Sequence, residues 1–167
     1  MEPNQKDFAE FALLGLRFRI LTPAAVIAWA DGIIAQTDNP AAWVIELAMA
    51  TADTIEDELK RVPGKGQIGL SLHLFLALVF RRWRSGTLTI EDACIIGWSL
   101  HCESALPRPK GQSDWGVRLS CELDEFEDGL RTEDELRNSI DEKLADYFSV
   151  DRMLPTWVDQ CGQLEPQ

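Results

Sequence analysis

The stretch from Glu122 to Asp146 is the part of the chain where side chains most clearly gather for chemistry, with eleven carboxylates and three basic residues. Carboxylates at this density could bind a cation or a basic protein. A solvated acidic surface is the alternative interpretation. We predict that the partner-binding residues are Glu122, Asp124, Glu125, Glu127, Asp128, Glu133, Asp134 and Glu135.

Within this stretch, Asp124–Glu135 resembles the calcium loop of the EF-hand family. It matches loop positions 1, 5, 6, 9 and 12 with Asp124, Asp128, Gly129, Thr132 and Glu135. Position 3 is Phe126, which offers no oxygen ligand, and position 8 is Arg131, where the family places an apolar residue. No second loop of this kind occurs in the sequence. We therefore expect neither a metal nor a cofactor.

An enzyme would have to draw on His73, His101 and Cys102. Neighbouring residues on a helix point about 100° apart, so His101 cannot act as the base for Cys102. His73 would be needed for that role, but it lies in an apolar run, where we expect a hydrogen-bonded core histidine. No GxSxG, HExxH or Rossmann glycine pattern occurs. A small helical enzyme with a site near these three residues is the alternative hypothesis.

The four cysteines contain no CxxC pair. Cys94 and Cys102 are eight positions apart on one predicted helix, which is about 12 Å along its axis and too far for a disulfide. We expect reduced structural thiols. The polar N-terminus predicts no signal peptide, and the longest apolar run, residues 68–80, is shorter than a membrane span. These features predict a cytoplasmic protein.

The net charge of −12 is unevenly distributed. Residues 1–88 hold nine Lys and Arg against ten Asp and Glu, whereas residues 89–167 hold seven against eighteen. An acidic surface repels nucleic acid and anionic lipid, and it attracts basic proteins. We therefore expect a basic protein partner, no nucleic acid and no membrane. The charge does not predict an oligomeric state.

The elements that must position these residues are helices. The sequence predicts a mainly α fold: one domain over residues 1–161, a bundle of about six or seven helices. An exposed linker is expected near 107–113 and a disordered tail over 162–167. Helix starts are predicted at Thr22-Pro23, Asn39-Pro40, Asp53, Thr89 and Thr132.

Residues 115–123 fit two templates. Alternating apolar residues match a strand, and Leu119, Leu123 and Phe126 match one helical stripe. We favour a helix, because the acidic residues that follow are poor strand formers. If the segment were a strand, Leu16, Phe18 and Ile20 would supply a second one, giving a minor two-stranded β element.

The stretch Arg17–Ala50 is similar to the opening of small bacterial proteins, some of which resemble immunity proteins that neutralise a toxin. The similarity rests on Arg-Phe-Arg-Ile-Leu-Thr-Pro, Val-Ile-Ala-Trp-Ala-Asp and Pro-Ala-Ala-Trp-Val-Ile-Glu-Leu. It implies an acidic cytosolic interaction module, such as an immunity protein or inhibitor of a basic partner. A helical adaptor or oligomeric scaffold is a further hypothesis.

Overall fold

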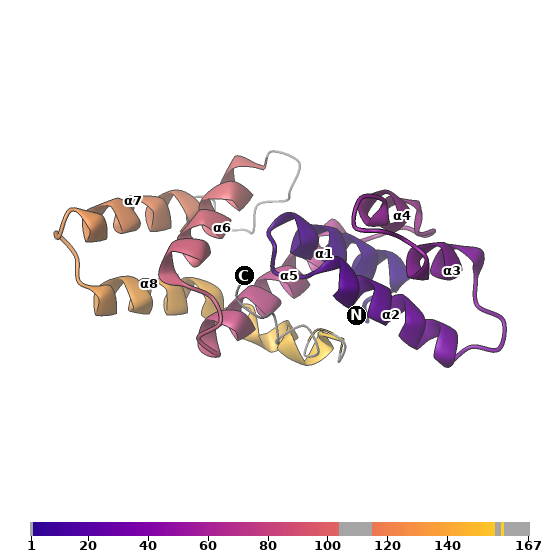
Figure 1. Cartoon of the computed structure of the whole chain (residues 1–167). Coiled ribbons are helices and arrows are strands. Elements are labelled where there is room, and N and C mark those ends of the chain that lie inside the picture. Colours follow the sequence, from indigo (N-terminus) through magenta and orange to yellow (C-terminus); the bar gives the residue numbers. More distant parts are fainter. Residues whose placement is uncertain (1, 104–114, 156–157, 159–167) are drawn as a thin grey trace. The chain divides into compact units, whose positions relative to one another are not determined.

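The computed structural model describes residues 2–103, 115–155 and 158. These residues form helices and contain no strand, which confirms the predicted mainly α class (Figure 1). The helices are α1 (Gln5–Arg17), α2 (Pro23–Ala35), α3 (Ala42–Ala48), α4 (Ile55–Arg61), α5 (Ile68–Arg84), α6 (Ile90–Cys102), α7 (Trp115–Glu127), α8 (Glu133–Ala145) and the 3-10 helix η1 (Phe148–Met153). Within the described ranges, none of them is both long and apolar enough to cross a membrane.

The alternative of a two-stranded β element is wrong. Residues 115–123 lie in α7, and the helical stripe buries Leu119 while Cys121, on the strand template, is exposed. The other expected strand falls at the end of α1, a helix that the sequence analysis missed. The sequence feature that marks the start of α1 is a capping box, in which Asn4 and Asp7 exchange hydrogen bonds between side chain and backbone.

Three helix pairs, α1–α2, α5–α6 and α7–α8, are joined by one kind of turn. The residue two positions past the end of the first helix adopts a left-handed backbone, and the next amide donates to the carbonyl five positions before it. A threonine then caps the next helix. The left-handed residues are Arg19, Gly86 and Gly129, and the capping threonines are Thr22, Thr89 and Thr132.

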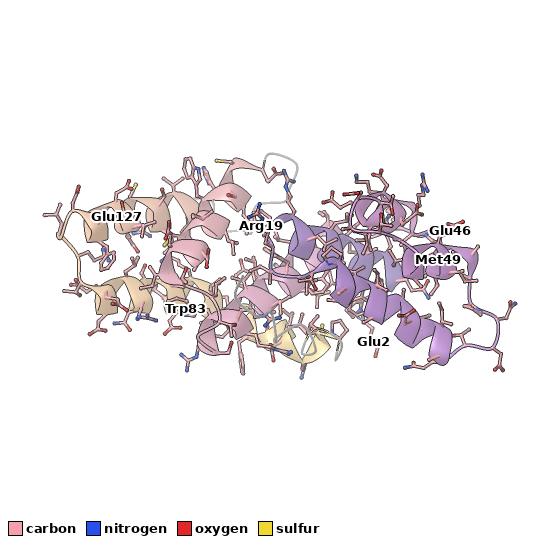
Figure 2. The ribbon with its side chains drawn as sticks, viewed as in Figure 1. Glu2, Arg19, Glu46, Met49, Trp83 and Glu127 are labelled. Carbon is pink, nitrogen blue, oxygen red and sulfur yellow. The ribbon has the colours of Figure 1, made fainter. Side chains whose placement is uncertain are left out.

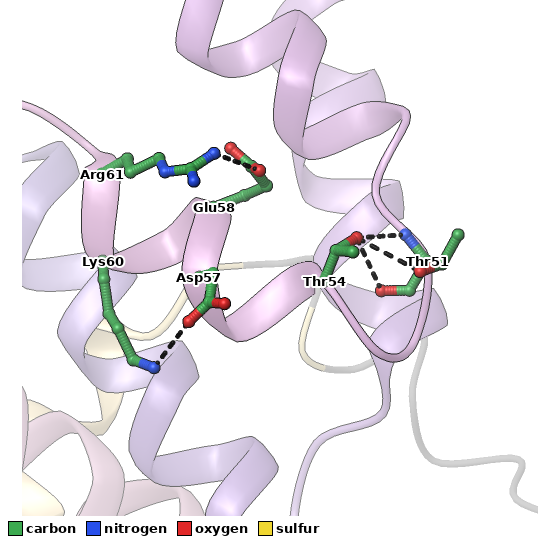
Figure 3. A network of polar contacts seen from close by, with 6 residues as sticks. All are labelled: Thr51, Thr54, Asp57, Glu58, Lys60 and Arg61. Atoms are coloured by element: carbon green, nitrogen blue, oxygen red, sulfur yellow. Dashed lines mark hydrogen bonds and ion pairs between the residues drawn. The ribbon is translucent and has the colours of Figure 1, made fainter.

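The helix starts predicted at the three threonines are confirmed. The start predicted at Asn39-Pro40 is wrong in detail, because α3 is preceded by Ala41 and has no side-chain cap. The helix predicted from Asp53 begins at Ile55. Local polar contacts stabilise α4, since Thr54 accepts from the Thr51 amide at 2.9 Å and two further pairs join side chains three positions apart (Figure 3).

The described chain divides into two compact units. The first comprises residues 1–75 with 153–167, and the second residues 76–152, so that the boundary falls within α5. Large buried side chains of the first unit include Phe11, Leu47, Leu59 and Phe75; those of the second include Leu119, Leu136, Ile140 and Leu144. The single domain over 1–161 stays a prediction. The expected linker near 107–113 and tail over 162–167 lie outside the described residues.

Candidate protein-interaction surface

The predicted acidic residues all lie on the α7–α8 hairpin, where α7 and α8 run side by side (Figure 1). Hydrogen bonds stabilise the turn between them at the end of α7 and at the start of α8. Gly129 has a φ of 72°, and the Leu130 amide donates to the Glu125 carbonyl at 2.8 Å, which closes α7. Thr132 and Glu135 form a capping box that opens α8. These contacts fix the backbone of the turn that carries the carboxylates.

The resemblance of this segment to a calcium loop does not extend to its geometry. A calcium loop wraps its ligands around one point. Here Asp124 is still within α7, and the Glu135 carboxylate accepts from the amide and the hydroxyl of Thr132, both at 2.8 Å. Among the residues that the structure describes, no group of three or more His, Cys, Asp or Glu side chains is arranged to hold a metal ion.

Four of the eight predicted carboxylates bond to other residues of the hairpin. Arg131 lies 3.0 Å from Glu125 and 4.0 Å from Glu122, whose side chain is only 15% exposed. The hydrogen bond with Glu125 raises the pKa of Arg131. Glu133 pairs with Arg137 at 2.7 Å. Hydrogen bonds from the Thr132 backbone and hydroxyl lower the pKa of Glu135. These four residues already have partners within the chain.

The other four, which we call the open carboxylates, are Asp124, Glu127, Asp128 and Asp134. All four are exposed, and their side chains make no hydrogen bond or ion pair with the described part of the chain. Three of them lie in or directly after the last turn of α7, where Glu127 is labelled in Figure 2. Asp134 lies in the first turn of α8. The structure thus brings them to the turn end of one hairpin.

The placement of the open carboxylates on α7 is unfavourable for the helix. The C-terminus of a helix carries a partial negative charge, which favours cations and disfavours carboxylates. The last turn of α7 has no basic residue, whereas that of α5 has three arginines, as expected for a stable helix end. The stability of the hairpin therefore does not account for Asp124, Glu127 and Asp128.

The residues of the enzyme hypothesis have less suitable surroundings. The prediction of a core histidine at His73 is wrong, because His73 is exposed on α5. On α5 the polar residue Ser71 is buried instead, and residues two positions apart lie on opposite sides of a helix. His101 is half-buried and stacks on Trp98 with ring centroids 5.9 Å apart, and Cys102 is exposed.

Of the described thiols, Cys94 is the buried one. Burial, with a smaller contribution from the charge of Glu122, raises its pKa to about 12. The thiol is therefore protonated at neutral pH and unreactive. Cys102 and Cys121 are exposed and free. Cys161 lies outside the described residues.

Comparison of the chain with protein-family models, curated proteins and solved structures found no match. The open carboxylates and their surroundings are therefore the structural features that point to a function. The similarity of Arg17–Ala50 to immunity-type proteins stays a prediction.

Proposed function

We propose that this chain is an acidic interaction protein that binds a basic partner protein through the α7–α8 hairpin, as an immunity protein or inhibitor does. One observation carries the proposal: the open carboxylates are exposed, without partners in the described chain, and three of them oppose the helix dipole of α7. Such a placement costs stability in the isolated chain. Binding to Lys or Arg side chains would recover it.

The electrostatics of the whole chain support the same proposal. With a net charge of −12, the protein attracts basic surfaces and accelerates their encounter. At physiological salt the screening length is about 8 Å, so that only carboxylates close to the partner's cations contribute strongly. Binding should therefore weaken with added salt. The free thiols of Cys94, Cys102 and Cys121 fit a reducing compartment, and we propose the cytoplasm.

The test compares three forms of the tagged chain in the lysate of its source organism. The first is the wild type. The second removes the open carboxylates with Asp124→Asn, Glu127→Gln, Asp128→Asn and Asp134→Asn. The third is a control that changes four exposed carboxylates of the other unit with Asp31→Asn, Asp38→Asn, Glu46→Gln and Asp53→Asn. Both variants change the net charge equally, so that a difference between them reports position.

We expect the wild type and the control variant to retain the same basic protein at low salt and to release it at high salt. The variant without the open carboxylates should retain much less of it, and its association rate with the purified partner should be lower. Equal retention by the two variants would show that the hairpin is not the binding surface. Absence of any basic protein on the wild type would contradict the proposed function.

A further inference from the structure

Leu130, at the tip of the α7–α8 hairpin, is an exposed apolar residue at a turn position where apolar residues are usually buried. Its side chain is 78% exposed. In this type of turn, the residue after the left-handed one commonly packs against an apolar residue near the helix end. The corresponding residue after α1, Ile20, is 8% exposed. After α7 the packing positions are Asp124 and Glu125, so that Leu130 has no apolar surface to cover.

The apolar stripe of α7 becomes progressively exposed toward this tip. Leu119 is 1% exposed, Leu123 and Phe126 are half-buried, and Leu130 is almost fully exposed. The cause is the position of α6, which crosses the hairpin at the end away from the turn (Figure 1). Gly116, in the first turn of α7, lies directly against the Gly97 carbonyl of α6. Among the residues that the structure describes, the turn end of the hairpin is thus a pair of helices without a third layer.

We infer that the turn end of the hairpin is the docking site for a basic amphipathic helix of the partner protein. This inference rests on the proposed function and assigns its contact. The apolar side of the partner helix covers Leu130 and Phe126, and its Lys or Arg side chains meet the open carboxylates around them. Charge complementarity selects this occupant, because an exposed apolar residue at the same end of the hairpin as four exposed carboxylates favours a ligand that combines apolar and basic groups.

The probes for the test are two labelled peptides of equal charge. One is an amphipathic helix of lysine and leucine, and the other replaces every leucine with serine. Binding of each to the full chain is measured by fluorescence anisotropy at low and high salt. The variants are Leu130→Ser and, as a matched control, Met49→Ser, because Met49 is also 78% exposed but lies directly after α3 (Figure 2). The variant without the open carboxylates is measured alongside.

We expect the lysine–leucine peptide to bind more tightly than the lysine–serine peptide. Leu130→Ser should weaken binding of the lysine–leucine peptide by about tenfold, the effect of losing one buried leucine, and leave the other peptide unaffected. Met49→Ser should change neither. If Leu130→Ser has no effect while both peptides bind in a salt-dependent way, this inference is wrong and the proposed function stands. If neither peptide binds at low salt, the proposed function itself fails.

Discussion

The carboxylate of Asp7 accepts a hydrogen bond from the backbone amide of Gln67, 60 positions later in the sequence, at 2.6 Å. Its second oxygen accepts from the Asn4 amide at 2.8 Å, so one buried side chain satisfies the amides that precede both α1 and α5. Lys6 adds to this contact by donating to the Lys60 carbonyl at 2.9 Å. The first turn of α1 thus holds the segment that leads into α5.

We predict that Asp7→Asn destabilises the protein by about 2–3 kcal/mol, although asparagine has nearly the same shape. Both oxygens of Asp7 act as acceptors, and an amide group would place a donor against one of the two backbone donors. Urea unfolding followed by circular dichroism measures the change. Asp57→Asn, at an exposed pair with Lys60, should cost much less. Equal losses in the two variants would contradict the proposed role of Asp7.

The turn after α1 contains a residue that is strained by its position. Arg19 has a φ of 56°, a left-handed conformation in which a side chain costs about 1–2 kcal/mol. We predict that Arg19→Gly stabilises the protein by about 1 kcal/mol, and that Gly86→Ala, at the equivalent position after α5, destabilises it by a similar amount. No atom lies within 4 Å of a methyl group added at Gly86, so that only backbone strain is tested. The thermal unfolding curves of the two variants should shift in opposite directions. A shift in the same direction would contradict the claim that Arg19 and Gly86 occupy equivalent positions in one type of turn.

Gly116 permits the close crossing of α6 and α7. A Cβ atom at this position would lie closer than 3.0 Å to both the Gly97 backbone and the His101 side chain. We predict that Gly116→Ala destabilises the protein by about 2 kcal/mol. Gly32→Ala is the control, because that glycine is within α2 and has open space around it; it should stabilise the protein by up to about 1 kcal/mol. A neutral Gly116→Ala in urea unfolding would show that the helices are not in close contact.

Tyr147, the single tyrosine of the chain, reports on burial through its titration. Burial, with a smaller effect of Asp146, raises its pKa to about 12. The unfolded chain releases this proton near pH 10 and the folded chain near 12, so the tyrosine's contribution to stability is constant below pH 10 and falls between these values. Tyrosinate absorbance should show a midpoint near pH 12 while circular dichroism still reports a folded chain. A native midpoint near 10 would contradict the burial of Tyr147.

The loss of stability at high pH should begin below the titration of Tyr147, because Cys94 adds a second raised pKa. Its thiol titrates at about 9 when exposed and at about 12 in the folded chain. We predict that the free energy of unfolding falls from about pH 9 upward, and that Tyr147→Phe makes this fall shallower above pH 10 and leaves it unchanged between pH 9 and 10. Denaturant unfolding at several pH values measures both. An unchanged slope in the Tyr147→Phe variant would contradict this division.

The sequence by itself determined the helical class and the starts of α2, α6 and α8. Thr22, Thr89 and Thr132 could be predicted as caps because a cap bonds an amide three positions away, a contact that depends on local chain geometry alone. The turn after α5 is local in the same way, because the Thr87 amide donates to the Arg82 carbonyl five positions back. The acidic segment could be recognised from the amino-acid composition. The composition did not show which of its carboxylates have partners within the hairpin and which are the open carboxylates.

Only the tertiary structure decided which residues are buried and which have partners. Asp7 is buried, and it bonds a segment 60 positions away. His73 is exposed although the residues on either side of it, Leu72 and Leu74, are buried. Residues 115–123 satisfied two periodic patterns, and packing of α7 against α6 and α8 selected the helix. Leu130 resembles a core residue in the sequence, yet no helix covers it within the described chain. Periodicity predicts which side of an element can be buried, but burial itself depends on contacts between residues far apart in the sequence.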